Sequence, residues 1–177
     1  MVFDISDRTQ IELTGVDRSK FLQGFCTNDI ARLKIGQGCE AFLTNIKGRV
    51  VGHIFVFATE NSLWIDTVNG QGDAIISHLD RYLIREDVQF CNHSDLGELF
   101  VTGLHASALL MLDEGLPPLG HLMRESFGQP FHIRRVDLTG SPGFQISLPR
   151  ENLATVKSSL LAVGCTSGSR DLFESLR

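Results

Sequence analysis

The pattern of apolar and polar residues predicts a strand in the middle of the first half of the chain. β-Branched and aromatic residues follow one another over residues 49–58, which favours a strand. Side chains of a strand point alternately to its two faces, so Ile54 and Val56 share one face while His53 and Phe55 share the other. We therefore expect a strand that is buried on both faces and carries one imidazole among apolar neighbours.

Turn residues extend this strand into a hairpin followed by a helix. Residues 60–62 turn the chain, residues 63–68 return as a second strand, and residues 69–73 lead into an amphipathic helix. This order brings four polar side chains towards one end of the predicted sheet: His53, Asp66, Thr67 and Asn69.

The same order of elements occurs twice along the chain. Residues 13–16 and 19–22 match residues 101–104 and 107–110, always 88 positions apart. Val16 and Leu104 precede the expected helix caps and should pack on their helices as hydrophobic staples. The first hairpin and helix are answered by strands near residues 131–138 and 144–148 and by a helix carrying Leu153, Val156, Leu160 and Leu161, whereas residues 113–129 read as a loop.

Two aligned halves indicate an internal duplication. We predict an α+β fold with mostly antiparallel sheets and helices packed outside. Residues 1–177 would form a single domain made of two related, interleaved halves, at about residues 8–92 and 96–165.

Composition and charge narrow the function. The net charge of −5 argues against nucleic acid as the main partner, which usually requires a basic face, and Arg134-Arg135 is too small a cluster to change this. We see neither a signal-peptide pattern nor an apolar run near the ~20 residues of a membrane helix, so we expect a soluble, cytoplasmic protein with no membrane partner. The irregular cysteine spacing predicts reduced, mostly buried thiols at Cys26, Cys39, Cys91 and Cys165.

Few residues offer chemistry, and each has a structural alternative. His53 could exchange a hydrogen bond or a proton with a ligand, or it could be a core histidine bonded to a backbone carbonyl. Asp66 could orient a ligand or face solvent. Cys91 and His93 are two potential metal ligands but not a set, so we predict no metal site. Residue chemistry alone assigns no catalytic residue.

Three ordered motifs resemble those of a known family. The first motif covers residues 17–49 and resembles the amino-terminal signature of the YgfZ-type folate-binding proteins, relatives of the glycine-cleavage T-protein, an aminomethyltransferase; it includes Phe21-Leu22-Gln23-Gly24, Thr27-Asn28-Asp29 and Gly48-Arg49. Thr139-Gly140-x-x-Gly143-Phe144-Gln145 resembles the Tyr-Thr-Gly-x-x-Gly-Phe-Glu turn of that superfamily. Gly168-Ser169-Arg170-Asp171 resembles its Gly-x-Arg-Asp segment.

The resemblance implies a duplicated folate-binding domain that binds tetrahydrofolate or a derivative. A YgfZ-like domain would be linked to iron–sulfur enzyme maintenance or tRNA modification, with an iron–sulfur assembly protein as a partner. One alternative is a T-protein-like aminomethyltransferase of the glycine cleavage system, and another is a non-catalytic protein-interaction module. The family's carboxyl-terminal barrel and cysteine motif do not occur in the sequence, so the chain is either part of a longer protein or a short form.

The resemblance also implies a set of binding residues. The family's reactive aspartate corresponds to His53, whose neutral imidazole supplies no fixed negative charge. The family's pterin-binding glutamate corresponds to Gln145, which keeps hydrogen-bonding atoms but loses the charge. Arg170 matches the family's arginine near the pterin and could instead grip the carboxylate of the folate tail. We expect five residues around one cavity between the halves: His53, Thr67, Asn69, Gln145 and Arg170.

Overall fold

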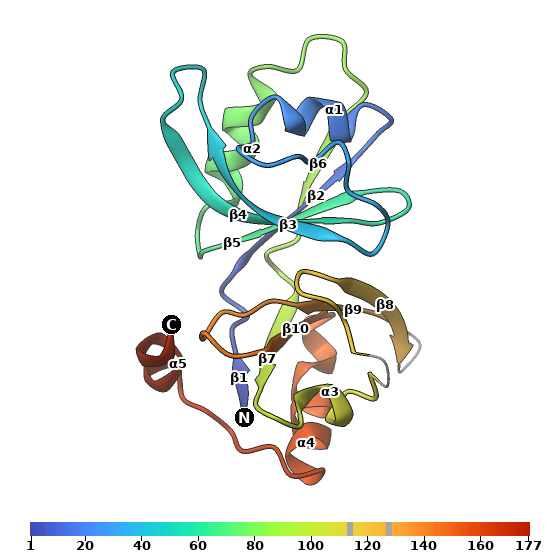
Figure 1. The fold of residues 1–177 in the computed structure, drawn as a ribbon, viewed down its shortest axis with the longest axis vertical. Coiled ribbons are helices and arrows are strands. Elements are labelled where there is room, and N and C mark those ends of the chain that lie inside the picture. Colours follow the sequence, from blue (N-terminus) through green and yellow to red (C-terminus); the bar gives the residue numbers. More distant parts are fainter. Residues whose placement is uncertain (113–114, 127–128) are drawn as a thin grey trace. The chain divides into compact units, whose positions relative to one another are not determined.

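Two antiparallel five-stranded sheets organise the chain, one in each of two units. The structure is a computed structural model that describes residues 1–112, 115–126 and 129–177 (Figure 1). One unit is the continuous segment Asp7–Ser94, and the other combines Met1–Ser6 with Asp95–Arg177. No described helix has the length and apolar character needed to cross a membrane.

The unit Asp7–Ser94 has the strand order β3-β4-β5-β2-β6. In chain order its elements are β2 (Thr9–Thr14), α1 (Arg18–Gln23), β3 (Gly38–Thr44), β4 (Val50–Ala58), β5 (Leu63–Thr67), α2 (Gly72–Asp80) and β6 (Gln89–Asn92). The predicted central hairpin is confirmed as β4 and β5, with strand limits within one residue of those expected.

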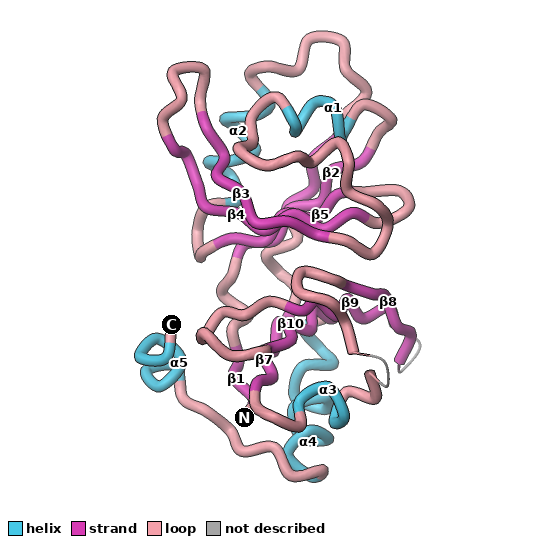
Figure 2. Tube along the Cα trace, viewed as in Figure 1, coloured by secondary structure: helices cyan, strands magenta, loops and turns pink. Residues whose placement is uncertain are grey.

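The second unit has the strand order β1-β7-β10-β9-β8. Its elements are β1 (Val2–Asp4), β7 (Gly97–Thr102), α3 (Ala106–Leu109), β8 (His121–Ser126), β9 (Gln129–Arg135), β10 (Gly143–Leu148), a 3₁₀ helix (Arg150–Asn152), α4 (Leu153–Ala162) and α5 (Arg170–Leu176). Figure 2 separates these helices from the strands by colour. The helix predicted around Val156 and Leu160 is confirmed as α4.

The two sheets correspond strand by strand, which confirms the duplicated α+β fold. The order β6-β2-β5-β4-β3 matches β1-β7-β10-β9-β8, and the helices α1 and α3 begin 88 positions apart, at Arg18 and Ala106. The outermost strands are exchanged, because β1 precedes β2 in the chain but pairs with β7, whereas β6 precedes β7 but pairs with β2. Each sheet therefore takes its outermost strand from the segment that immediately precedes the other half of the repeat.

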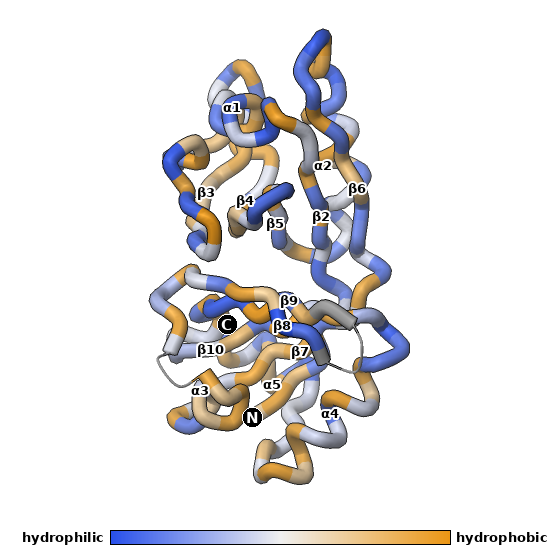
Figure 3. Tube along the Cα trace, turned by 90° about the vertical axis from the view of Figure 1, so that its right-hand side faces the viewer, coloured by the Kyte–Doolittle hydropathy of each residue, from blue (hydrophilic) through white to orange (hydrophobic). Residues whose placement is uncertain are grey.

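Helix α2 covers one face of the first sheet and α4 covers one face of the second, whereas Phe173 of α5 packs against Phe3 and Phe100 on the other face of the second sheet. In the unit Asp7–Ser94, Ile54 and Val56 of β4 join Ile75 and Leu79 of α2 in one apolar core. The second unit has an equivalent core, in which residues of β7, β9 and β10 pack with Val156 and Leu160 of α4. Figure 3 colours the chain by hydropathy and shows both hydrophobic and hydrophilic positions in each of the two sheets. Burying each large apolar side chain stabilises the folded state by about 1.5–3 kcal/mol. The helices therefore pack on the apolar side chains of each sheet.

Two local predictions are wrong. Part of the segment expected to be a loop is β8, and the remainder includes residues 113–114 and 127–128, which lie outside the described residues. Val16 and Leu104 do not form staples, because they are 82% and 98% exposed.

Candidate functional site

Polar and aromatic side chains gather on the sheet face that α1 and α2 leave uncovered in the unit Asp7–Ser94. The side chains of Ile54 and Val56 point into the apolar core between the sheet and the helices. The neighbouring side chains of His53 and Phe55 therefore point to the opposite face of the sheet. Asp66 lies on this same face, since it pairs directly with Phe55 across β4 and β5. The strand period therefore collects chemically active groups on one surface of the sheet.

His53 lies beside a carboxylate that the sequence analysis did not single out. Its Nε2 atom is 2.6 Å from Oε1 of Glu40 on the neighbouring strand β3. The two side chains are 38% and 58% exposed, so this pair is open to solvent. The expected burial among apolar neighbours is thus incomplete, and the alternative of a core histidine bonded to a backbone carbonyl is wrong. An exposed imidazole–carboxylate pair is able to bind or exchange protons with a ligand.

Thr67 is connected to His53 directly, whereas Asn69 lies farther along the chain. The buried Thr67 hydroxyl donates a hydrogen bond of 2.6 Å to the backbone carbonyl of His53. Asn69 is exposed and follows β5 in the turn before α2. Thr67 therefore fixes the backbone that carries the imidazole.

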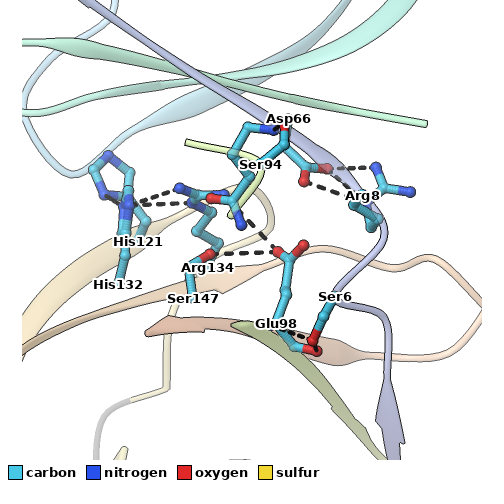
Figure 4. A network of polar contacts seen from close by, with 10 residues as sticks. Ser6, Arg8, Asp66, Ser94, Glu98, His121, His132, Arg134 and Ser147 are labelled. Carbon is cyan, nitrogen blue, oxygen red and sulfur yellow. Dashed lines mark hydrogen bonds and ion pairs between the residues drawn. The ribbon is translucent and has the colours of Figure 1, made fainter. Parts of the chain in front are cut away.

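Asp66 is buried and paired, so the alternative that it faces solvent is wrong. Nε of Arg8 donates to the two Asp66 carboxylate oxygens at 3.0 and 3.2 Å, and Nη2 of Arg8 makes a further short contact (Figure 4). Both side chains are almost fully inaccessible to solvent. Each charge therefore compensates the other, which a buried carboxylate requires.

In the second unit, Gln145 lies on β10 beside a buried polar network. Its direct cross-strand partner on β9 is Arg134, whose Nε and Nη2 atoms lie 3.2 and 2.9 Å from Nδ1 of His132. Nε2 of His132 is in turn 2.8 Å from Nδ1 of His121 on β8 (Figure 4). Glu98 completes the set at 4.0 Å from Arg134.

This network fixes the protonation of His132. An arginine only donates, so Nδ1 of His132 must accept, and its Nε2 carries the hydrogen that is donated to His121. Burial first, and then the charge of Arg134 and the proximity of His121, hold the pKa of His132 well below its usual 6.5. The ring therefore stays neutral. The strand alternation of His132 and Arg134 was visible in the sequence, but the β8 partner was not.

Arg170, the last of the expected binding residues, begins α5. Its Nη2 atom is 2.7 Å from Oε1 of Glu174 one turn later, and its guanidinium lies over the Phe173 ring at 5.6 Å from the ring centre. The side chain is 43% exposed. His53 and Thr67 are thus brought together within one unit, and Gln145 and Arg170 belong to the other. The shared cavity of all five residues stays a prediction.

The remaining candidate residues do not form a metal site in the part of the chain that the structure describes. His93 pairs with Glu12 at 3.2 Å and packs against Trp64. Cys39 and Cys165 are buried as expected, but Cys91 is exposed. Burial raises the pKa of the half-buried Cys26 thiol to about 12, so this thiol is not reactive near neutral pH.

Comparison with known proteins identifies the family. Residues 1–172 match the family described as the GCVT N-terminal domain. The chain belongs to this family. Two similar proteins are the aminomethyltransferases of Deinococcus deserti, 28% identical over 180 residues, and of Bordetella petrii, 26% identical over 182 residues. Each alignment covers 96% of this GCVT N-terminal domain and 50% of the relative.

A solved structure confirms the fold of this GCVT N-terminal domain. The glycine cleavage system aminomethyltransferase T from Bartonella henselae superposes with a TM-score of 0.80 at 24% sequence identity. The superposition covers 95% of the present chain and 46% of that protein. The chain thus spans about half the length of the relatives it matches, and the predicted resemblance to the T-protein superfamily is confirmed.

Proposed function

We propose that this GCVT N-terminal domain is the tetrahydrofolate-binding part of an aminomethyltransferase of the glycine cleavage system. The observation that carries the proposal is the family match over residues 1–172, together with the aminomethyltransferase name of the similar proteins. Tetrahydrofolate supplies the ring nitrogen that takes up the one-carbon unit. The chain's own residues would bind and orient that ring.

The chemistry of the exposed side chains in the unit Asp7–Ser94 fits such a ligand. A reduced pterin offers N–H donors, ring acceptors and a flat face. His53 and Glu40 provide polar atoms that accept hydrogen bonds, and the rings of Phe42 and Phe55 lie 5.4 and 5.2 Å from the imidazole, where a flat ring can pack against them. These four side chains come from two neighbouring strands, which suits precise orientation of a ligand.

Two residues of the second unit also have side chains whose chemistry suits a folate. Gln145 would hydrogen-bond the pterin through its carboxamide, which both donates and accepts. Arg170 would bind the pterin or the carboxylate of the glutamate tail, since a guanidinium can hold a carboxylate through two parallel hydrogen bonds. Its existing partner is another carboxylate, Glu174, which a ligand carboxylate would replace.

The aminomethyltransferase, an alternative at the level of sequence, is better supported than the YgfZ-like function that the resemblance first implied. The similar proteins named above carry the aminomethyltransferase name, which supports transfer of an aminomethyl group. Neither the comparisons nor the geometry adds support for iron–sulfur enzyme maintenance, tRNA modification or an iron–sulfur assembly partner. The non-catalytic interaction module is the outcome to be excluded by experiment.

Calorimetry with tetrahydrofolate and with 5-formyltetrahydrofolate tests the proposal. We expect saturable binding of at least one of them to the chain and to any longer natural form, and turnover of an aminomethyl-lipoyl carrier by that longer form. Absence of binding by both proteins would favour the interaction module. Binding without turnover would leave a folate-binding role and exclude the transferase.

A further inference from the structure

Glu40 has a further role in the same site, which rests on the folate-binding function proposed above. Glu40 lies on β3 and His53 on β4, where His53 pairs directly with Phe42. Because Glu40 is two residues from Phe42, its side chain points to the same face as the imidazole. The resulting separation of 2.6 Å between Nε2 and the carboxylate is that of a strong, charge-assisted hydrogen bond.

This contact decides which nitrogen of His53 carries hydrogen. An ionised carboxylate accepts and does not donate, so Nε2 of His53 must be the donor towards Glu40. In the neutral ring, the lone pair is then on Nδ1. Among the described residues, none donates a hydrogen bond to Nδ1. That atom is therefore an oriented acceptor without a partner inside its own unit.

Other contacts hold the imidazole in place. Phe42 and Phe55 flank it, with rings inclined at 44° and 66° to its plane. The Thr67 hydroxyl holds the His53 carbonyl at 2.6 Å. The side chain nevertheless remains 38% exposed, so a ligand can reach it. The ring is thus restrained by its neighbours and open on the side that they leave free.

We propose that Glu40 is a positioning residue that holds His53 in the Nε2–H form, so that Nδ1 accepts a hydrogen bond from a ring N–H group of the bound folate. A carboxylate at position 40 and an imidazole at position 53 would together take the place of the single aspartate that the family resemblance implies at position 53. Protonation of the ring would convert Nδ1 into a donor and abolish this contact.

Other charged groups on the same sheet face do not compete for the imidazole. On β5 the nearest such group is Asp66, whose carboxylate is paired with Arg8. On β3 the charged partner is Glu40 itself. Glu40 is therefore the charged neighbour that can set the tautomer of His53.

The test compares wild type, Glu40→Gln and the control Glu60→Gln, in which an exposed carboxylate of the same unit is neutralised. A glutamine at position 40 can donate to Nε2, which allows the opposite tautomer with hydrogen on Nδ1. We expect Glu40→Gln to weaken tetrahydrofolate binding about 3- to 10-fold, within the range of one lost hydrogen bond. Glu60→Gln should bind like wild type. Thermal unfolding of each variant shows whether it is folded.

Two further readouts separate positioning from a merely structural role. Nitrogen-15 NMR of the imidazole in the ligand-free chain should show hydrogen on Nε2 in wild type and a mixture of both tautomers in Glu40→Gln. Wild-type affinity should fall in acid, because a proton on Nδ1 turns this acceptor into a donor. The affinity of Glu40→Gln should depend less on pH, because a smaller fraction of its molecules has an Nδ1 atom that can accept a hydrogen bond.

The possible failures are distinguishable. If wild type binds tetrahydrofolate while Glu40→Gln has the same affinity, pH profile and tautomer, the role of Glu40 is refuted and the proposed function stands. If folded wild type binds no folate, the proposed function and the ligand role of Nδ1 fail together. The NMR result then still shows whether Glu40 sets the tautomer.

Discussion

Arg170 illustrates how a side chain with a local partner can still serve a ligand. Its guanidinium is half-exposed and shares its charge with Glu174 one turn along α5. Such surface pairs contribute little to stability, so exchanging one carboxylate for another costs little. The proposed folate contact is therefore compatible with the fold.

Replacing Arg170 by alanine should weaken tetrahydrofolate binding by about 1.5–3 kcal/mol, or roughly 10- to 150-fold, the range for a hydrogen bond to a charged group. The matched control is Arg32→Ala, because Arg32 is also exposed and paired with a carboxylate on its own segment, Asp29. Calorimetry should find the control unchanged. Equal affinities for both variants would remove Arg170 from the site.

At the scale of elements, close contacts between strands restrict which residues fit. Gly143 begins β10 opposite Thr102 of β7, and an added Cβ would overlap the aromatic ring of Phe100. Phe100 is fully buried and also contacts Phe3 and Phe173, so it cannot move away easily. The position therefore requires glycine for close approach.

Gly143→Ala should lower the free energy of unfolding by about 1–3 kcal/mol, the usual cost of overpacking a core. Gly52→Ala is the control, because an added Cβ at Gly52 in β4 has its nearest neighbour at 3.6 Å, an ordinary contact. Urea unfolding followed by circular dichroism measures both variants. A midpoint for Gly143→Ala equal to that of Gly52→Ala would contradict the packing argument.

Elements with a strong local signal could be predicted from the sequence. The β4–β5 hairpin combines β-branched residues with a clear turn, and α2 and α4 have helical spacing. By contrast, β8 follows Pro117-Pro118 and reads His-Leu-Met-Arg-Glu-Ser, which is a weak strand signal. It lies at the edge of its sheet beside β9, so its strand state depends on that partner.

The candidate site was less predictable because its contacts depend on strand register. Glu40 and His53 are 13 positions apart, and Arg8 and Asp66 are 58 apart. Each pair meets only when neighbouring strands align in one particular way, and a shift of one residue would turn the side chains to the opposite face. Sequence motifs located His53, Gln145 and Arg170, but they did not indicate these partners.

For the whole molecule, the buried His132 makes stability depend on pH. Its pKa in the folded protein lies well below the unfolded value of 6.5, so below about pH 6.5 the unfolded chain binds more protons than the folded chain. The contribution of His132 is fully present above pH 6.5 and is lost as the pH falls towards the folded pKa. Its largest slope is about 1.4 kcal/mol per pH unit.

Urea unfolding at several pH values between about 5 and 7.5 should reveal this loss in wild type. His132→Gln should reduce the slope, because glutamine does not titrate, whereas the control His105→Gln at an exposed position should not. An unchanged slope in His132→Gln would show that other groups control the acid sensitivity.

The exchanged strand β1 links the amino terminus to the unit that contains the carboxyl terminus. Val2 donates a backbone hydrogen bond to Thr166 and accepts one from Gly168, each of 2.8 Å, while β1 pairs with β7. Removing residues 1–6 should therefore increase hydrogen exchange in β7 and residues 166–168. Protection of β2, β4 and β5 should remain, and faster exchange mainly in those strands would contradict this assignment.

The same strand has a consequence for the order of events on the ribosome. Val2 pairs with Val101, so β1 leaves the exit tunnel long before its partner has been translated. Asp7–Ser94, in contrast, is a continuous segment and becomes complete first. The nascent chain must therefore keep its first strand unpaired while a whole unit is synthesised. Until β7 appears, this apolar segment is available to molecular chaperones.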